Sequence, residues 1–290
     1  MGDAASRELE TEREREYSPS SCIGGNYQPY LLAYAERSAR ARARWPGRLN
    51  LRYGPSEAQQ LDLFVPVPGT LDTANRPPPL LCFIHGGYWQ ELGKSDSSFA
   101  AVHCVEQGIA YAALDYTLAP QATVAQMVTE CRQAVAWFIA NAPTLGFDAQ
   151  RIVLAGSSAG AQLAAMAAMP AAASASPVAA AILVSGIYTL EPLIGTSIND
   201  ALGLSLDTAR AASPALWPLQ HFPPSVVCWG EVETAAFKHQ SRDFAARLRT
   251  AGSSCHTIEV PQRNHFDVVL ELANPAMMLG AATLALIRSL

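Results

Sequence analysis

The pentapeptide G-S-S-A-G at residues 156–160 restricts the fold of this chain more than any other part of its sequence. It follows directly on the apolar run 152–155 and directly precedes the helix-forming stretch 161–166. A serine on a sharp strand-to-helix turn, with glycine two residues away on either side, is typical of a nucleophile elbow. The backbone at such a serine is strained, and neighbouring chain passes so close that flanking side chains would clash. An ordinary glycine- and serine-rich turn is the alternative, but the position between strand and helix favours a catalytic Ser158.

Strand-like apolar runs alternate with amphipathic helical stretches over most of the chain. Residues 80–84 and 109–114 are apolar throughout, as expected for strands covered on both faces. Residues 61–65 alternate apolar and polar, which predicts a strand of an antiparallel hairpin near the edge of the sheet. Alternation of strands with helices predicts an α/β fold, with a mainly parallel central sheet and helices on both faces. Strands are expected at 61–65, 80–84, 109–114, 152–155, 180–184, 226–229 and 256–260, and helices at 28–45, 123–141, 238–250 and 272–289.

The alternation is interrupted at two places. Residues 1–20 are charged with both signs and are expected to form a flexible or loosely helical N-terminal arm. Residues 186–224, rich in Pro, Leu and Gly, are expected to form a small cap or pocket wall over the carboxyl edge of the sheet. No linker separates two domains, so residues 21–290 are predicted to be one domain carrying this insertion.

Composition narrows the class of protein. A formal net charge of −5 and a sequence pI near 5.7 give no sign of a nucleic-acid or anionic membrane partner. No apolar run approaches the roughly 20 residues that span a bilayer, and residues 1–16 lack the apolar core of a secretory signal. We therefore expect a cytoplasmic enzyme that binds a small molecule, with no nucleic-acid or membrane partner. Whether it is a monomer or a homodimer is left open.

The cysteines show no metal-ligand spacing. Two of them, Cys82 and Cys228, fall inside strand-like runs, where a thiol behaves as a small buried hydrophobe. No cofactor and no metal are expected. Reduced, structural thiols are predicted for all six cysteines, which are Cys22, Cys82, Cys104, Cys131, Cys228 and Cys255.

A nucleophilic serine needs a histidine base and a carboxylate that orients it. After an elbow of this kind the acid and then the histidine should follow in chain order, each at the end of a later strand. His265 fits, since it lies in a loop after the strand 256–260 and before the last helix. His256, His239 and His221 are expected inside that strand, in a helix and in the cap insertion, respectively.

The acid is less sharply defined. Two glutamates, Glu231 and Glu233, follow the strand 226–229. Glu233 is favoured because a residue three past Gly230 can fold back toward the His265 loop. Glu231 is the main alternative, and two weaker ones are Asp243, within a helix, and Asp267, beyond the histidine.

An acyl-transfer site also needs backbone N–H donors for the oxyanion. One is expected from Ala159, at the start of the helix after Ser158. Others are expected from Gly86, Gly87 and Tyr88, in the loop after the strand 80–84, because glycines let backbone N–H groups turn into a pocket. His85 in the same loop is expected to fix the loop rather than to act as a catalyst.

Several motifs together resemble one family. H-G-G-Y-W-Q at residues 85–90 resembles the H-G-G-x-W motif of the kynurenine formamidases, α/β-hydrolases related to the hormone-sensitive-lipase-like esterases. A-G-S-S-A-G-A-Q-L at 155–163 resembles the G-H-S-A-G-A-H-L elbow of that family, and D-Y-T-L-A-P at 115–120 its D-Y-x-x-A-P segment. E-Y-S-P-S at 16–20 resembles its N-terminal arm. The resemblance covers most of the chain and implies an α/β-hydrolase fold.

The resemblance also implies roles for individual residues. Ser158 stands at the nucleophile position, Glu233 at the acid position and His265 at the base position. The sequence departs from the family pattern at Ser157 and Gln162, where the family often has histidine, and Glu233 replaces a more usual Asp. These changes bear on which substrate is bound rather than on the chemistry.

The resemblance implies hydrolysis of an aryl formamide such as N-formyl-L-kynurenine to formate and an aromatic amine, through a formyl-enzyme. A narrow end lined by Tyr88 and Trp89 would suit the formyl group, and Ser157 also lies near the pocket. Further aromatic residues are candidates for the wall around the aromatic leaving group, namely Tyr27, Tyr30, Tyr188 and Trp217.

Two other functions remain open at this point. A carboxylesterase for short-acyl esters would use the same mechanism. A non-catalytic binder on a hydrolase scaffold is a different class of protein, but such proteins usually lose one of the three catalytic residues.

Overall fold

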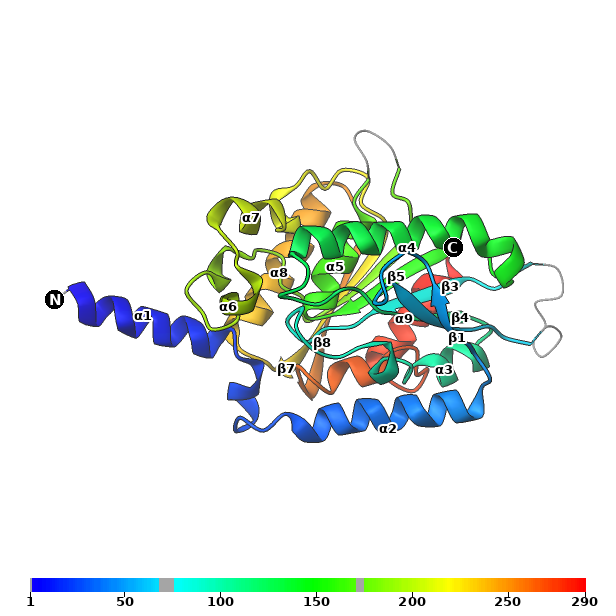
Figure 1. The fold of residues 1–290 in the computed structure, drawn as a ribbon, viewed down its shortest axis with the longest axis horizontal. Coiled ribbons are helices and arrows are strands. Elements are labelled where there is room, and N and C mark those ends of the chain that lie inside the picture. The colour runs from blue at the N-terminus through cyan, green and yellow to red at the C-terminus, as the bar shows by residue number, and fades with distance from the viewer. Residues whose placement is uncertain (1, 68–75, 171–174) are drawn as a thin grey trace.

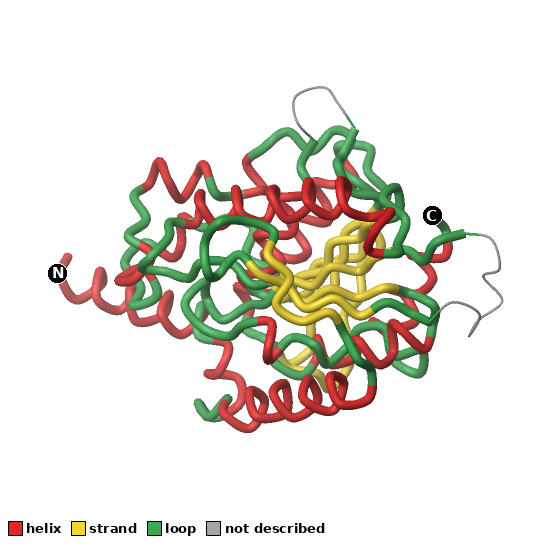
Figure 2. The backbone as a smooth tube through the Cα atoms, turned by 45° about the vertical axis from the view of Figure 1, so that its right-hand side comes forward, coloured by secondary structure: helices red, strands yellow, loops and turns green. Residues whose placement is uncertain are grey.

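A computed structural model describes residues 2–67, 76–170 and 175–290 of the chain (Figure 1). Its centre is a twisted eight-stranded sheet with the strand order β1-β2-β4-β3-β5-β6-β7-β8 (Figure 2). Strands β3 to β8 run parallel, whereas β2 is antiparallel to both β1 and β4. The strands are β1 (Arg48–Arg52), β2 (Gln60–Phe64), β3 (Leu80–Ile84), β4 (Ala110–Leu114), β5 (Ile152–Ser157), β6 (Ala180–Val184), β7 (Ser225–Val232) and β8 (Cys255–Asn264).

Helices cover both faces of this sheet. One core contains buried residues of α4 (Val124–Leu145), α5 (Ala159–Ala168) and α8 (Ala235–Thr250). The other contains buried residues of α2 (Gln28–Arg44), α3 (Ala101–Glu106) and α9 (Met278–Arg288). The remaining helices are α1 (Gly2–Glu16), α6 (Asn199–Leu202) and α7 (Leu206–Ala211), and single 3-10 turns lie at Pro19–Ile23, Lys94–Asp96, Glu191–Leu193, Pro214–Leu216 and Val268–Glu271.

The pleat of the strands explains these two cores. Successive side chains of a strand point to opposite faces. On β3, Cys82 and Ile84 belong to the core beneath α4 and α5, whereas Leu81 and Phe83 belong to the core beneath α2 and α3. The strand is buried along its whole length, which is why its sequence is apolar throughout.

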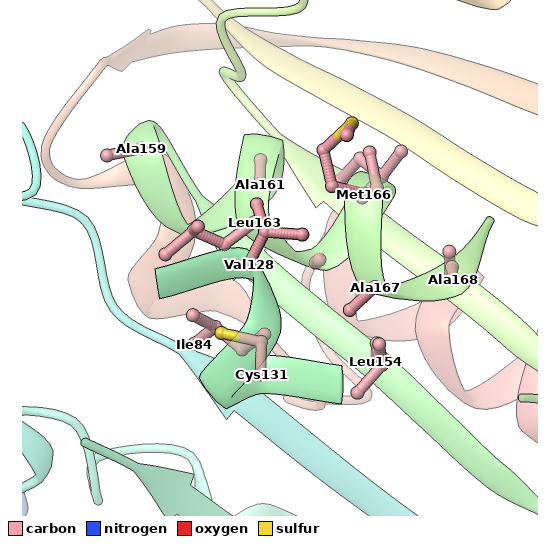
Figure 3. Packing of buried hydrophobic residues seen from close by; sticks show 14 of the residues in the cluster. Ile84, Val128, Cys131, Leu154, Ala159, Ala161, Leu163, Met166, Ala167 and Ala168 are labelled. Carbon is pink, nitrogen blue, oxygen red and sulfur yellow. The ribbon is translucent and has the colours of Figure 1, made fainter. Parts of the chain in front are cut away.

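Helix α5 is buried at every position, because it lies between the sheet and α4. Its side chains are mostly alanine, and this small size lets the helix approach its neighbours closely. Figure 3 shows its Leu163 beside Val128 of α4, with Cys131 of α4 near Ile84 of the sheet. The helix that begins after Ser158 is therefore a rigid support.

The fold class predicted from the sequence is confirmed, and β3 and β6 occupy the predicted residues. The ends of the other predicted elements shift by a few residues, and two differences are larger. The edge strand β1 was not expected; its side chains are mostly exposed, so it lacks the apolar signal of a buried strand. Helix α9 begins at Met278 rather than at residue 272, because Asn274-Pro275 lies in the intervening turn and proline disfavours a helical conformation in the residue before it.

The two segments outside the alternation carry short or projecting helices. Residues 2–16, expected to be a flexible or loosely helical arm, form α1, whose N-terminal end projects from the body (Figure 1). The insertion at 186–224 contains α6, α7 and two 3-10 turns. The predicted domain boundaries remain predictions.

None of the helices within the described ranges is long and apolar enough to cross a membrane. All six cysteines are free thiols, and four of them are buried, namely Cys82, Cys104, Cys131 and Cys228.

Candidate active site

Ser158 occupies a strained turn between β5 and α5. Its backbone has φ 56° and ψ −121°, a conformation that non-glycine residues rarely adopt. A Cβ on Gly160 would lie 2.0 Å from the carbonyl oxygen of Ile84, and one on Gly156 would lie 2.1 Å from the carbonyl oxygen of Gly160. Only glycine fits at these two positions, so the turn has the geometry of a nucleophile elbow.

His265 and Glu233 meet at the carboxyl ends of β8 and β7. The Nδ1 atom of His265 lies 3.0 Å from Oε2 of Glu233, and both side chains are almost fully buried. The other oxygen of Glu233 accepts hydrogen bonds from the Ser185 hydroxyl and the Gly230 N–H, each at 2.6 Å. The carboxylate is thus fixed on one side and orients the imidazole on the other. Ser158 and His265 border the same cavity.

The other candidate acids have different partners. Glu231 is exposed and accepts a hydrogen bond from the Gln262 N–H at 2.8 Å. Asp267 accepts from a backbone N–H of its own loop at 2.7 Å, and Asp243 forms an ion pair of 3.0 Å within α8. Of these four carboxylates, Glu233 is the one in contact with His265.

We call residues 85–89, which follow β3, the Gly-Gly loop. Three successive residues of this loop have positive φ, namely Gly87 (89°), Tyr88 (50°) and Trp89 (60°). Gly86, Gly87 and Tyr88 border the cavity together with Ser158. Ala159 is the first residue of α5, where helical N–H groups lack intrahelical acceptors. All the predicted oxyanion donors therefore lie beside Ser158 or directly follow it in the chain.

His85 sits at the base of the Gly-Gly loop. Its Nδ1 atom lies 2.9 Å from the carbonyl oxygen of Gly86, and its ring stacks on Tyr116 with a centroid distance of 4.4 Å. Burial lowers the pKa of His85 to about 4, so the ring is neutral at neutral pH and donates from Nδ1. Nε2 lies 3.9 Å from Asp115, whose pKa is raised to about 6, mainly by burial. These contacts match the expected loop-fixing role of His85.

The cavity beside Ser158 and His265 has a volume of about 220 Å³. Carboxylates are present among its described lining residues, whereas Lys and Arg are not. Burial raises the pKa of one of these carboxyl groups, Glu91. The aromatic wall residues are Tyr17, Tyr27, Tyr34, Phe83, Tyr88, Phe99 and Phe266; the aliphatic ones are Leu31, Leu92, Ile198 and Val269; the acidic ones are Glu14, Glu91 and Asp96.

The predicted substrate-binding residues lie in different places relative to the cavity. Tyr88 and Ser157 border the cavity, but Trp89, Tyr188 and Trp217 do not. Trp89, the last residue of the loop, is fully buried, and Tyr188 is fully buried with its ring stacked 4.2 Å from an aromatic ring of α8. Trp217 is 43% exposed, and its indole donates to the last carbonyl of α7. Substrate contacts by these three residues stay predictions that the cavity, as the described residues line it, does not support.

Some cavity residues were not predicted. Residues 17–20 and Tyr34 line the cavity although they lie far from the catalytic motifs in the sequence. The motif at residues 16–20 was the available signal for the first group. Tyr27 borders the cavity as proposed, whereas Tyr30 accepts a hydrogen bond from Asn264 at 2.9 Å.

No group of three or more His, Cys, Asp and Glu side chains within the described part of the chain could hold a metal ion.

Sequence comparisons relate most of the chain to enzymes of known class. The BD-FAE family model matches residues 61–180. A kynurenine formamidase from Salmo salar is 33% identical over 277 residues, which cover 91% of this chain and 91% of that protein. A kynurenine formamidase from Danio rerio is 30% identical over 95% of this chain and 96% of that protein. The chain belongs to the kynurenine formamidase family.

Other similarities surround this family relationship. Esterase LipC from Mycobacterium tuberculosis is 27% identical over 78% of this chain, which covers 61% of that esterase. A solved structure from Silicibacter sp. TM1040 superposes with a TM-score of 0.77 and 28% identity, over 94% of this chain and 97% of the other. This member of the kynurenine formamidase family is therefore an α/β-hydrolase enzyme, and the resemblance inferred from the sequence motifs is confirmed.

Proposed function

We propose that this enzyme hydrolyses an aryl formamide such as N-formyl-L-kynurenine, with Ser158 as nucleophile, His265 as base and Glu233 as acid. The 3.0 Å contact between His265 and Glu233 at the cavity that Ser158 borders carries this proposal. His265 accepts the proton of the Ser158 hydroxyl as its oxygen attacks the formyl carbonyl. Glu233 holds the imidazole in the required tautomer and stabilises its positive charge.

The negative charge that forms on the carbonyl oxygen needs hydrogen-bond donors that are already in place. The N–H groups of Gly87, Tyr88 and Ala159 would supply them, with Gly86 giving the loop its close approach to Ser158. One such donor typically lowers the barrier by about 3 kcal/mol. His265 then protonates the leaving amine, and water repeats the cycle on the formyl-enzyme to release formate.

The cavity walls suit the leaving group of such a substrate. A formyl group needs little space, whereas the aromatic amine needs a flat apolar site. Tyr27, Tyr34, Phe99 and Phe266 supply aromatic surface next to the catalytic residues. The kynurenine formamidases among the relatives support the same substrate class.

The decisive experiment measures hydrolysis of N-formyl-L-kynurenine by wild type and by Ser158→Ala, followed through kynurenine absorbance. We expect turnover by the wild type and a loss of at least about 10⁴-fold in the variant, because the nucleophile is removed. A wild type that leaves this substrate intact would refute the formamidase assignment.

A carboxylesterase acting on short-acyl esters is the second candidate, favoured by the similarity to esterase LipC. It uses the same three residues, so the ratio of kcat/KM on N-formyl-L-kynurenine to that on p-nitrophenyl acetate separates the two functions. A ratio well above one supports the formamidase, and a ratio well below one supports the esterase.

The assignment of the acid is tested by a matched pair of variants. We expect Glu233→Gln to lower kcat by about 10³-fold, because an amide does not hold His265 in the right tautomer. Glu231→Gln, two residues away and exposed, should change kcat less than twofold. Equal losses in the two variants would contradict the role of Glu233.

A cytoplasmic location is a further proposal, supported by six free thiols that suit a reducing compartment. Neither the monomer nor the homodimer is favoured, and size-exclusion chromatography with light scattering distinguishes them.

A further inference from the structure

The N-terminal segment, here residues 13–20, reaches from α1 into the active site. Its residues Glu14 and 17–20 line the cavity, and Tyr17 is almost fully buried. The N-terminal end of α1 projects from the body (Figure 1), so the contacts with the site are made by the other end of this helix and the residues that follow it.

Two residues fasten this segment to the insertion at 186–224. The carboxylate of Glu14 accepts hydrogen bonds from both the backbone N–H and the hydroxyl of Ser197. The guanidinium of Arg13 donates to the carbonyl of Ile194 at 3.0 Å. Because both partners lie in the insertion, the segment and the insertion form one continuous wall.

The N-terminal segment also forms hydrogen bonds with Thr234, which follows the proposed acid Glu233, and with Ala236. The hydroxyl of Thr234 donates to the carbonyl of Glu16 at 2.6 Å, and the N–H of Ala236 donates to the Glu16 carboxylate at 3.0 Å. A carboxylate near the first N–H groups of α8 is a favourable helix-end interaction.

Tyr17 links the N-terminal segment to the Gly-Gly loop and, through Phe237, to His265. Its carbonyl accepts the hydroxyl proton of Tyr88, in the Gly-Gly loop. Its ring packs on Phe237 at 6.1 Å, and Phe237 in turn lies edge-on to His265 at 4.5 Å. Its own hydroxyl accepts a hydrogen bond from Gln240 at 3.0 Å. One residue therefore touches the loop that would hold the oxyanion and the ring that packs on the proposed base.

The conformation of the Gly-Gly loop needs stabilising contacts of this kind. Gly87, Tyr88 and Trp89 all have positive φ, and conformations of this kind persist only where surrounding structure determines them. Gln162 holds Trp89 from behind, at 3.0 Å, and Tyr17 holds Tyr88 from the cavity side.

We propose that the N-terminal segment is a positioning element of the active site, with Tyr17 holding the Gly-Gly loop in the conformation that stabilises the oxyanion. This proposal rests on the proposed hydrolase mechanism, but not on the identity of its substrate. It predicts that loss of the hydrogen bond between Tyr88 and Tyr17 lowers the rate of the chemical step and leaves substrate binding nearly unchanged.

A double-mutant cycle on p-nitrophenyl acetate tests it. Tyr88→Phe removes the hydroxyl that donates to Tyr17, and deletion of residues 2–17 removes the acceptor. Each change should lower kcat about tenfold and shift KM less than twofold, and the combined variant should lose no more than the larger single effect. Affinity for phenylboronic acid, whose tetrahedral adduct with serine places an oxygen at the oxyanion position, should fall by the same factor as kcat/KM.

The matched control is deletion of residues 2–9, which shortens the projecting part of α1 and leaves Arg13 and Glu14 in place. This variant should keep wild-type kcat. Circular dichroism and the thermal midpoint show whether each variant folds. If the longer deletion does not fold, Glu14→Ala replaces it in the cycle, with an expected threefold loss.

Effects that multiply in the combined variant, a deletion of residues 2–17 that retains full kcat, or a change confined to KM would each overturn the proposal. The ester keeps this test apart from the formamidase assignment, which fails on its own if only N-formyl-L-kynurenine is left intact. If the wild type hydrolyses neither compound, the rate of fluorophosphonate labelling of Ser158 replaces kcat in the same cycle. A wild type that is not labelled overturns both proposals.

Discussion

The elbow at residues 156–160 and the Gly-Gly loop at residues 85–89 both hold non-glycine residues at positive φ beside the same cavity. In the elbow, the conformation follows from contacts between backbone atoms, since a Cβ on Gly160 would lie 2.0 Å from a carbonyl oxygen. In the loop, Tyr88 and Trp89 are held by side-chain hydrogen bonds to Tyr17 and Gln162, far away in the sequence. The elbow is thus determined by close contacts between backbone atoms, including those of β3, and the loop by side-chain hydrogen bonds.

This difference has a functional consequence. Backbone packing leaves the elbow one conformation, so a substitution there should abolish activity. The side-chain hydrogen bonds that hold the Gly-Gly loop act independently, so removing one of them should lower activity only partly.

The largest expected effect comes from breaking the elbow. Gly160→Ala places a methyl group against the carbonyl of Ile84 and must displace α5 or β3. We expect kcat/KM to fall by at least about 10³-fold and the free energy of unfolding to fall by about 3 kcal/mol. Ester hydrolysis and urea denaturation measure the two effects. Near-normal activity in this variant would remove the distinction between elbow and loop.

The second-largest effect is expected at Gln162, which forms a hydrogen bond with Trp89 of the Gly-Gly loop. Gln162 is fully buried, accepts from the Trp89 indole at 3.0 Å and donates to the Ala212 carbonyl at 2.8 Å. Gln162→Leu leaves both groups unpaired, which should destabilise the fold by about 2 kcal/mol and lower kcat about tenfold. Gln162→His keeps one donor and one acceptor and should lose less. Equal losses in the two variants would show that hydrogen bonding at this position is irrelevant.

The base of the loop should respond to pH. The pKa of His85 lies near 4 in the folded chain and near 6.5 in the unfolded chain, so only the unfolded state gains a proton as the pH falls through 6.5 toward 4. His85 therefore contributes stability above pH 6.5 that is lost as the pH falls to 4. Between pH 7 and pH 4, the free energy of unfolding of the wild type should fall by about 3 kcal/mol more than that of His85→Asn.

The comparison with His85→Asn is needed because Asp115 acts in the opposite direction. Its pKa is raised to about 6, so its contribution to stability is present below about pH 4 and is lost as the pH rises to 6. Urea denaturation of both proteins across this range separates the two groups, since Asp115 is common to both. Parallel curves would mean that His85 titrates normally.

The smallest effects concern the cavity wall. Trp217 is exposed and outside the cavity, so Trp217→Ala should change kcat/KM on N-formyl-L-kynurenine less than twofold. Tyr27 borders the cavity and stacks on Phe266 at 5.5 Å, so Tyr27→Ala should raise KM about fivefold. A larger effect at Trp217 than at Tyr27 would support the substrate contact predicted for Trp217 from the sequence.

Much of the fold was predictable because its signals are local. Buried strands such as β3 are apolar throughout, and α4 is preceded by the N-cap residue Thr123, which forms a capping box with Gln126. The edge strand β1 escaped prediction because its side chains are mostly exposed. The start of α9 was misplaced because apolar residues before Met278 pack in a turn rather than a helix.

In the candidate site, too, some residues could be predicted from local sequence signals and others could not. Ser158 and His265 were predictable because each follows a strand in the chain order that this chemistry needs, and the structure brings Glu233 rather than Glu231 to the histidine. The aromatic wall was predicted only in part, since Tyr27 and Tyr88 border the cavity but other predicted aromatic residues do not. Trp89 and Tyr17 are both aromatic residues in motifs, yet Trp89 lies in the core and Tyr17 beside the cavity.

The sequence by itself determined the order of strands and helices and the strained serine turn, because periodicity and glycine spacing can be recognised within short stretches of the chain. Only the tertiary structure decided which carboxylate meets the imidazole, which aromatic rings surround the cavity, and that the N-terminal segment reaches the Gly-Gly loop. These features depend on side chains from distant segments meeting at the carboxyl edge of the sheet, and no local pattern in the chain encodes those meetings.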